Sequence, residues 1–176
     1  MVTRRHGREW ALQLLVQFDF EAPKSLAEAQ EAFWSQQAEL EQDALAEDRR
    51  EAKEIFTSTD PKVLSELADI RAFADERVTG VWTERDKLDE QIEPFLEHWS
   101  LYRLGTIERN VLRLGAWELL HSEIPTAIII NESVDLAKFF SSTKAGRFVN
   151  GILDRFAKTV RTVAASKENE TETFTP

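Results

Sequence analysis

Three arginines near the N-terminus are the residues whose type and spacing most favour chemistry. Arg4, Arg5 and Arg8 stand at the start of a predicted helix, where each positive charge opposes the helix dipole at a cost of roughly a few tenths of a kcal/mol. Guanidinium groups bind phosphate oxygens through paired hydrogen bonds. The apolar stripe of this helix begins only at Trp10, so we expect its first two turns to project beyond the core. The cluster favours a phosphate-binding site, and a solvated basic helix end is the alternative.

A polar stripe along a predicted helix near the C-terminus is the second candidate site. It comprises Arg147, Asn150, Asp154 and Lys158. Arginine and lysine position a nucleic-acid backbone, and asparagine can read a base edge. Gly151 borders the stripe at a cost of about 1 kcal/mol relative to alanine, which indicates close approach by either another helix or a ligand. Phe148 lies at its margin, where it could stack a base or pack into the core.

Patterns for catalysis or metal binding are missing from the sequence. It contains no glycine-rich phosphate loop, nucleophile elbow or plausible Ser/His/Asp set. There is no cysteine, and His6, His98 and His121 are widely separated. We therefore expect a protein that is not an enzyme and that holds neither a metal ion nor a cofactor.

Composition and charge limit the kind of partner. The 176 residues carry a net charge of -10, which argues against broad, nonspecific nucleic-acid binding. The acidic residues concentrate between 28 and 97, whereas basic residues gather near both ends, so local and salt-dependent binding remains open. No apolar run approaches the roughly 18 residues that cross a bilayer, and the start lacks a signal-peptide pattern. These features predict a cytoplasmic protein.

Helical periodicity predicts an all-α fold that positions both basic segments. The expected helices cover 4–20, a stretch from 26 to about 40, a region from 61 to a break near Trp99, 107–120, 125–140 and 144–163. Ser25 with Glu28, and Asp60 with Pro61, are typical of helix starts. Residues 41–60 are highly charged and predict either a solvated helix extension or a mobile loop.

Apolar residues nearly all round 107–120 indicate a central, buried helix. Glu118 shares a face with those apolar residues, which suggests either a buried carboxylate or a partner interface. We expect 165–176 to form a disordered tail.

Four segments resemble the NusB family of bacterial transcription antitermination factors. RRHGREWALQLLVQFDF at 4–20 is similar to the arginine-rich first helix of that family. The others are LYRLGTIERNVLRLGAWELL at 101–120, IPTAIIINESVDLAKFF at 124–140 and GRFVNGILD at 146–154. Their order and spacing are specific in combination, and the acidic middle is more divergent.

The resemblance implies a bundle of about seven helices in one domain, 1–164, with subdomains at about 1–99 and 100–164. It implies no enzymatic activity. Family members bind the single-stranded boxA RNA of ribosomal RNA leader transcripts together with NusE, a small-subunit ribosomal protein, and join an RNA polymerase antitermination complex.

Carried onto this sequence, the resemblance implies particular contact residues. The RNA-binding positions are Arg4, Arg5, His6, Arg8, Lys144, Arg147, Phe148 and Asn150. The partner surface would involve Val16 and Glu108. His6 and Gly7 stand where the family often has arginine and alanine, and Val16 replaces a commonly aromatic position.

Other classes of protein remain as alternatives. A helical protein–protein interaction module would share the fold without RNA affinity. The RNA-targeting domain of some ribosomal RNA cytosine methyltransferases is similar but is fused to a cofactor-binding domain, for which this length leaves no room. A DNA-binding regulator would need a basic helix-turn-helix, which the sequence does not show. The resemblance leaves a monomer and a homodimer both open.

Overall fold

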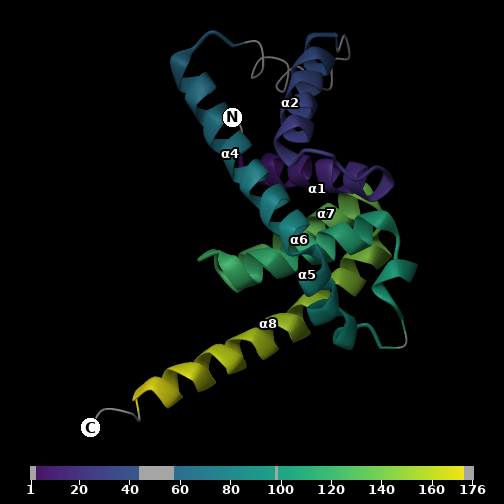
Figure 1. The fold of residues 1–176 in the computed structure, drawn as a ribbon, viewed down its shortest axis with the longest axis vertical. Helices are drawn as coiled ribbons and strands as arrows, with labels where there is room; N and C mark the ends of the chain where they lie inside the picture. Colours follow the sequence, from purple (N-terminus) through teal and green to yellow (C-terminus); the bar gives the residue numbers. More distant parts are fainter. Residues whose placement is uncertain (1–2, 44–57, 98, 173–176) are drawn as a thin grey trace. The chain divides into compact units, whose positions relative to one another are not determined.

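In the computed structural model, the described residues are 3–43, 58–97 and 99–172, with side chains described over 3–39, 58–97 and 99–160. Within these ranges the secondary structure is helical and includes no strand. The α-helices are α1 (Arg4–Phe20), α2 (Leu26–Asp43), α4 (Pro61–Thr83), α5 (Arg85–Ile92), α6 (Thr106–His121), α7 (Thr126–Phe140) and α8 (Thr143–Glu172) (Figure 1). Two short 3-10 turns, η2 (Glu93–Phe95) and η3 (Leu101–Arg103), lie between α5 and α6. The predicted all-α fold is confirmed.

Local hydrogen bonds form at the helix starts that the sequence predicted. The backbone N–H of Glu28 donates to Ser25 Oγ at 3.3 Å at the start of α2. At the start of α4, the backbone N–H of Lys62 donates to Asp60 Oδ1 at 2.8 Å, and Pro61 occupies the first helical position. These bonds satisfy backbone donors that have no partner within a helix. Among the described residues, no helix is long and apolar enough to span a bilayer.

The chain divides into two compact units, Met1–Trp82 and Thr83–Pro176, called here the N-terminal and C-terminal units. The division falls earlier than the predicted boundary near 99 and 100. Its physical reason lies in α5, which buries Leu88 and Ile92 and forms an ion pair with α6. This helix therefore belongs with the C-terminal helices, although its apolar pattern continues that of α4.

Aromatic side chains join the helices of the N-terminal unit, in addition to buried aliphatic residues such as Leu12, Leu15 and Val78. Trp34 on α2 meets Trp10 of α1 edge to face, with 5.3 Å between ring centroids. Its Nε1 donates a 2.9 Å hydrogen bond to Asp75 Oδ1 on α4. Phe18 of α1 contacts Trp82 in the same edge-to-face manner at 5.1 Å. Such pairs join the three helices through directional contacts as well as through burial.

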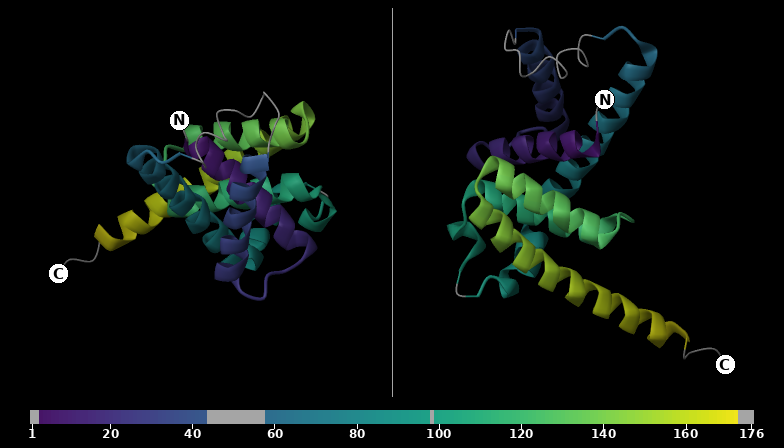
Figure 2. Two further views of the ribbon diagram at one scale, coloured as in Figure 1. Left: turned by 90° about the horizontal axis from the view of Figure 1, so that it is seen from above. Right: turned by 180° about the vertical axis from the view of Figure 1, so that it is seen from behind.

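Polar contacts between α2 and α4 lie close to that aromatic cluster. Gln30 Nε2 donates to the backbone oxygen of Asp75 at 3.0 Å, and Arg71 forms an ion pair with Glu31. Burial raises the pKa of the Asp75 carboxyl above its ordinary value, although Trp34 and Arg71 act in the opposite direction. α2 and α4 approach each other near α1 and separate toward their other ends (Figures 1 and 2).

The C-terminal unit is built around α6, which is buried continuously from Asn110 to Glu118. This confirms the predicted central helix. A Cβ atom on Gly115 would lie 2.6 Å from Leu153 Cδ1 of α8 and 2.8 Å from Ser133 Oγ of α7. The glycine therefore allows both neighbouring helices to approach α6 closely. Glu118 is fully buried, which favours the first of its two interpretations.

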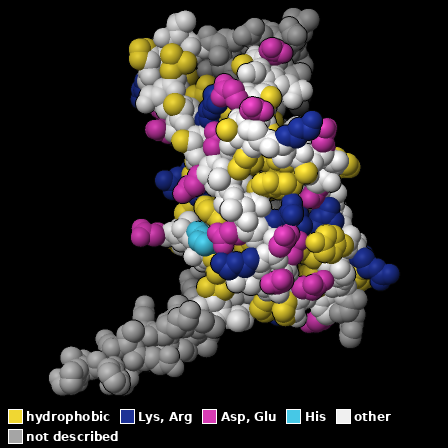
Figure 3. All heavy atoms as spheres, in the orientation of Figure 1, with side chains coloured by type: hydrophobic (Ala, Val, Ile, Leu, Met, Phe, Trp, Pro, Cys, Tyr) yellow, Lys and Arg dark blue, Asp and Glu magenta, His cyan; other side chains and the backbone are white. Residues whose placement is uncertain are grey.

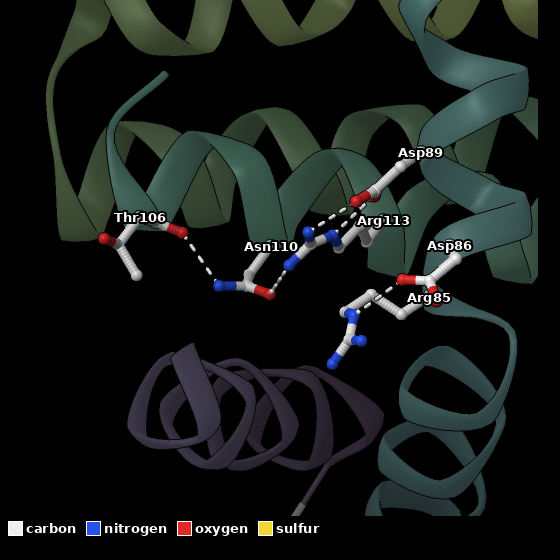
Figure 4. Close-up of polar contacts among 6 residues, drawn as sticks. All are labelled: Arg85, Asp86, Asp89, Thr106, Asn110 and Arg113. Atoms are coloured by element: carbon white, nitrogen blue, oxygen red, sulfur yellow. Dashed lines mark hydrogen bonds and ion pairs between the residues drawn. The ribbon is translucent and has the colours of Figure 1, made fainter. Parts of the chain in front are cut away.

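A buried ion pair joins α5 to α6 (Figure 4). Arg113 donates from Nε to Asp89 Oδ1 and from Nη2 to Asp89 Oδ2, both at 2.7 Å. Arg113 also donates to Asn110 Oδ1 at 3.3 Å, and Asn110 donates to the backbone oxygen of Thr106 at 2.9 Å. This chain of bonds satisfies polar groups that burial would otherwise leave without partners.

Two predicted segments differ in extent or lie outside the description. α8 continues to Glu172, past the predicted end at 163 and into the segment 165–176 that was expected to be a disordered tail. Alanine, lysine and glutamate are frequent there, and these residue types favour helix. In Figures 1 and 2, its end extends beyond the other helices of the C-terminal unit. Residues 173–176, and 44–57 of the charged segment, lie outside the described residues.

Candidate nucleic-acid interface

One aromatic ring of α4 gathers the guanidinium groups of the N-terminal unit. Arg4 and Arg8 of α1 lie over Phe73 at 5.5 and 5.3 Å from the ring centroid. Arg77 of α4 lies 3.2 Å from the same centroid, and its Nη1 donates to the backbone oxygen of Phe73 at 3.0 Å. Guanidinium groups are attracted to the negative face of an aromatic ring. Part of the arginine cluster therefore has a packing role.

The expectation that the first two turns of α1 project beyond the core is wrong. Gly7 is buried, and a Cβ there would lie 2.8 Å from Phe73 Cδ1. Arg8 is only 3% exposed. The start of α1 packs against α4 because glycine permits the close approach. The solvent-facing cations of this helix start are consequently Arg4 and Arg5, and Arg5 pairs with Glu9 at 3.3 Å.

His6 helps to form the start of α1. The backbone N–H of Thr3 donates to His6 Nδ1 at 3.1 Å. The imidazole therefore supplies an acceptor for a backbone donor at the helix start, as the third side chain of a helix does in a capping box. Its ring lies 6.2 Å from the Trp10 ring in a tilted arrangement. The histidine orients the helix start that carries Arg4 and Arg5.

Two adjoining hollows open beside the N-terminal half of α8. The first, of about 390 Å³, is lined by residues that include Trp99, Arg103, Lys144 and Phe148. The second, of about 330 Å³, is lined by residues that include Trp99, Arg147 and Phe148. Trp99 and Phe148 thus border both hollows. We call these five residues the aromatic–basic surface.

The cations of this surface differ from their neighbours in their pairing. Among the side chains described in the C-terminal unit, Arg103, Lys144 and Arg147 are the cations that have no hydrogen bond or ion pair to another described residue. By contrast, Lys158 pairs with Asp154 at 2.7 Å. Unpaired positive charge is therefore concentrated around two aromatic rings.

The predicted polar stripe is exposed, but only its first residue lines a hollow. Asn150 is exposed on α8 without bordering either hollow. Gly151 borders the second hollow, and no described atom lies within 4 Å of a Cβ built there. No helix of the described part of the chain therefore approaches Gly151, which argues against close helix packing as the reason for this glycine.

The residues implied for partner binding are partly accessible. Val16 of α1 is partly exposed. Glu108 of α6 borders the first hollow and accepts a 2.6 Å hydrogen bond from Ser141 Oγ. That bond joins the start of α6 to the end of α7.

Sequence reasoning missed Trp99 and Arg103. Both lie in the short connection between η2 and α6, where no helical periodicity marks a face. Trp99 is 58% exposed. A tryptophan and an arginine within a connection between helices are the signal that could have identified them, because binding residues concentrate on connections held by a rigid scaffold.

The RNA-binding residues predicted from the sequence belong to both units. Arg4, Arg5, His6 and Arg8 belong to the N-terminal unit, whereas Lys144, Arg147, Phe148 and Asn150 belong to the C-terminal unit. On the face shown in Figure 3, lysine and arginine side chains are mixed with aspartate and glutamate. This mixture agrees with the expectation of local rather than broad electrostatic binding.

Comparison with known sequences identifies one family. The NusB family model matches residues 57–158. The transcription antitermination protein NusB of Myxococcus xanthus is 40% identical over 158 residues, which cover 89% of this chain and 96% of the relative. The protein of the same name from Syntrophotalea carbinolica is 34% identical over 164 residues, covering 93% and 97% of the two chains.

Solved structures show a similar fold. Thermotoga maritima NusB superposes with a TM-score of 0.64 at 28% identity, covering 89% of this chain and 92% of the other. A structure of antitermination factors NusB and NusE in complex with double-stranded RNA gives a TM-score of 0.60 at 27% identity, covering 89% and 96%. The solution structure of Aquifex aeolicus NusB gives 0.64 at 27% identity, covering 93% of each chain.

Proposed function

Because this chain belongs to the NusB family of transcription antitermination proteins, we propose that it binds the boxA RNA of ribosomal RNA leader transcripts together with NusE. The family is non-catalytic, so its members act by binding. The proposed outcome is processive ribosomal RNA transcription, within an RNA polymerase complex in the cytoplasm.

The aromatic–basic surface is the observation that carries this proposal. Its three cations have no partner among the described residues, so their charge is available to phosphate groups. Its aromatic rings offer faces on which unpaired bases stack. A surface for protein docking alone would not require this combination.

Two exposed arginines of the N-terminal unit supply a second set of phosphate contacts in this proposal. Arg4 and Arg5 remain solvent-facing after Arg8 is buried against Phe73. We assign His6 and Arg8 to the positioning of this helix start, because the first forms its cap and the second packs against α4. Asn150 remains a candidate for reading a base edge from the exposed side of α8.

NusE is the proposed protein partner, with contacts at Val16 and Glu108. The net charge of -10 repels an RNA backbone at long range, so a few unpaired cations provide modest affinity alone. A partner that adds positive charge would raise that affinity. We therefore expect tight binding only in the three-component complex.

A binding measurement tests this function. We expect a fluorescein-labelled boxA-like RNA oligonucleotide to bind more tightly with NusE than without it, and to dissociate as salt is raised from about 50 to 200 mM. Arg147→Ala and Arg5→Ala should each weaken binding by roughly threefold to tenfold, with an unchanged thermal transition.

Lys87→Ala is the matched control, because it removes one exposed charge that is paired with Glu84. Its RNA affinity should equal that of the unchanged chain. Binding to NusE without salt-sensitive RNA affinity would instead support a helical protein–protein interaction module and would overturn the RNA-binding proposal.

A further inference from the structure

An exposed tryptophan lies next to α8 and lines the two hollows. Trp99 is 58% exposed, whereas Trp34 and Trp117 are 5% and 7% exposed. Exposure alone indicates no binding role, because single apolar side chains are common at protein surfaces and Phe20 and Phe139 are 80% and 71% exposed. The surroundings of Trp99 are what distinguish it. Its ring and that of Phe148 border both hollows.

The segment that precedes Trp99 is fastened to α8. Arg155 donates from Nη2 to the backbone oxygen of Phe95 at 2.8 Å and forms an ion pair with Glu97. Phe95 also contacts Phe156 edge to face, with 5.8 Å between centroids. The backbone N–H of Trp99 donates to Leu96 at 2.8 Å. These contacts restrict the movement of the connection, so the exposed ring is supported rather than left on a long free loop.

Unpaired positive charge flanks this ring on both sides. Arg103 and Lys144 line the first hollow, and Arg147 lines the second. Consecutive phosphates of a single strand flank each base, so cations on both sides of an aromatic ring match the repeat of a nucleotide chain.

We propose that Trp99 and Phe148 form a stacking site for one unpaired RNA base, and that Arg103 binds a phosphate next to that base. This site rests on the proposed RNA-binding function and adds two residues to it. Trp99 provides the accessible ring, Phe148 borders both hollows beside it, and the cations hold the strand on each side.

The surrounding chemistry favours single-stranded RNA over the other anionic partners. An acidic peptide could pair its carboxylates with the cations, but it brings no nucleobase to stack on the rings of Trp99 and Phe148. A duplex keeps its bases stacked within the helix, so the faces that Trp99 could contact are not available. An unpaired base with its phosphates uses both the ring and the cations.

Four variants test the site in the presence of NusE, with a fluorescein-labelled single-stranded boxA-like oligonucleotide as the probe. Trp99→Leu removes the aromatic face and should weaken binding about tenfold, whereas Trp99→Phe keeps a face and should stay within about threefold. Arg103→Ala should weaken binding about threefold to tenfold. Lys87→Ala removes a charge that is paired with Glu84, and it should leave binding unchanged.

The salt dependence of RNA affinity distinguishes the stacking of a base from the binding of a phosphate. Arg103→Ala should reduce the slope of log affinity against log salt by about one, because one phosphate contact is lost. Trp99→Leu should leave that slope unchanged, since a ring releases no counterions. Circular dichroism of each variant should match that of the unchanged chain, because both positions are exposed.

Three results would overturn the stacking site alone, and a fourth would overturn both proposals. RNA affinity of Trp99→Leu equal to that of the unchanged chain would remove the site while leaving the proposed function standing. An equal loss of affinity for a duplex of the same length would show that no unpaired base is held. A loss of NusE binding without RNA would reassign Trp99 to a protein contact. Failure of the unchanged chain to bind RNA would overturn both proposals.

Discussion

The two units of this protein use different side chains for cohesion. The N-terminal unit joins its helices through aromatic rings and guanidinium groups, such as the three arginines around Phe73. The C-terminal unit packs aliphatic side chains around α6, where Gly115 allows close helix approach, and adds one buried ion pair. The first adds directional contacts of rings and guanidinium groups to its apolar core, and the second adds a buried ion pair to closely packed helices.

This difference shows why residue type alone does not reveal a binding site. Arginines near the start of α1 resemble a phosphate-binding site in the sequence, yet Arg8 is buried and packs against Phe73. Cations near the start of α8 belong to the second candidate site of the sequence, and there Lys144 and Arg147 have no partner among the described residues. The two regions differ less in how many cations they contain than in whether those cations are free of partners among the described residues.

The largest expected effect comes from removing the buried cation of the C-terminal unit. Arg113→Ala leaves Asp89 buried with neither of its two guanidinium hydrogen bonds. We expect a loss of about 3–5 kcal/mol in the free energy of unfolding, measured by urea denaturation followed by circular dichroism.

Arg85→Ala serves as the control, because Arg85 pairs with the exposed Asp86 at 3.1 Å. That substitution should cost about 1 kcal/mol or less. Similar losses for the two variants would mean that burial does not distinguish these ion pairs.

A smaller effect is expected from the arginine-bound ring of the N-terminal unit. Phe73→Leu keeps most of the apolar volume but removes the ring face that Arg8 and Arg77 contact. The free energy of unfolding should fall by about 1–3 kcal/mol, because cation–π contacts of desolvated arginines contribute up to about 2 kcal/mol. Phe20 is 80% exposed, and Phe20→Leu should change stability by less than about 0.5 kcal/mol. Equal effects of the two substitutions in urea titrations would refute the role of the ring.

The smallest expected effects are the contributions of two carboxyl groups to stability, which change with pH in opposite directions. Burial raises the pKa of Asp75 above its ordinary value of 3.8, so its contribution to stability is lost as pH rises through the raised pKa. The hydrogen bond from Lys87 lowers the pKa of Glu84 below its ordinary value of 4.5, so its contribution is lost as pH falls through the lowered pKa.

Substitution of each carboxyl group by its amide checks these signs. Between about pH 3 and pH 6, Asp75→Asn should gain stability relative to the unchanged chain as pH rises, and Glu84→Gln should lose it. The measurement is the free energy of unfolding in urea at several pH values. Parallel pH profiles for the two variants would contradict the assignment.

Most helix positions followed from the sequence because their signals are local. Ser25 and Asp60 accept hydrogen bonds from nearby backbone donors, and the periodicity of α6 identified a buried helix. The division after Trp82 was not predicted, because apolar periodicity continues from α4 into α5. The burial of Leu88 and Ile92 and the bidentate pairing of Asp89 with Arg113, 24 residues away, show that α5 packs with the later helices.

The candidate site was predicted less completely than the fold. Arg147 and Phe148 follow from the pattern of one helix and Lys144 from the family resemblance, and the structure brings them together around the two hollows. Trp99 belongs to a connection, so its proximity to Phe148 depends on contacts between segments that are distant in sequence. The burial of Arg8 was missed for the same reason, since Phe73 lies on another helix.

The length of α8 has a practical consequence for measurements on this protein. Its 30 residues correspond to about 45 Å at 1.5 Å per residue, and the hollows lie beside its first part. Its far end extends beyond the other helices of the C-terminal unit (Figure 1). A dye or surface anchor attached after α8 would therefore stand tens of ångströms from the aromatic–basic surface. Immobilisation through the C-terminus is the attachment least expected to obstruct RNA at that surface.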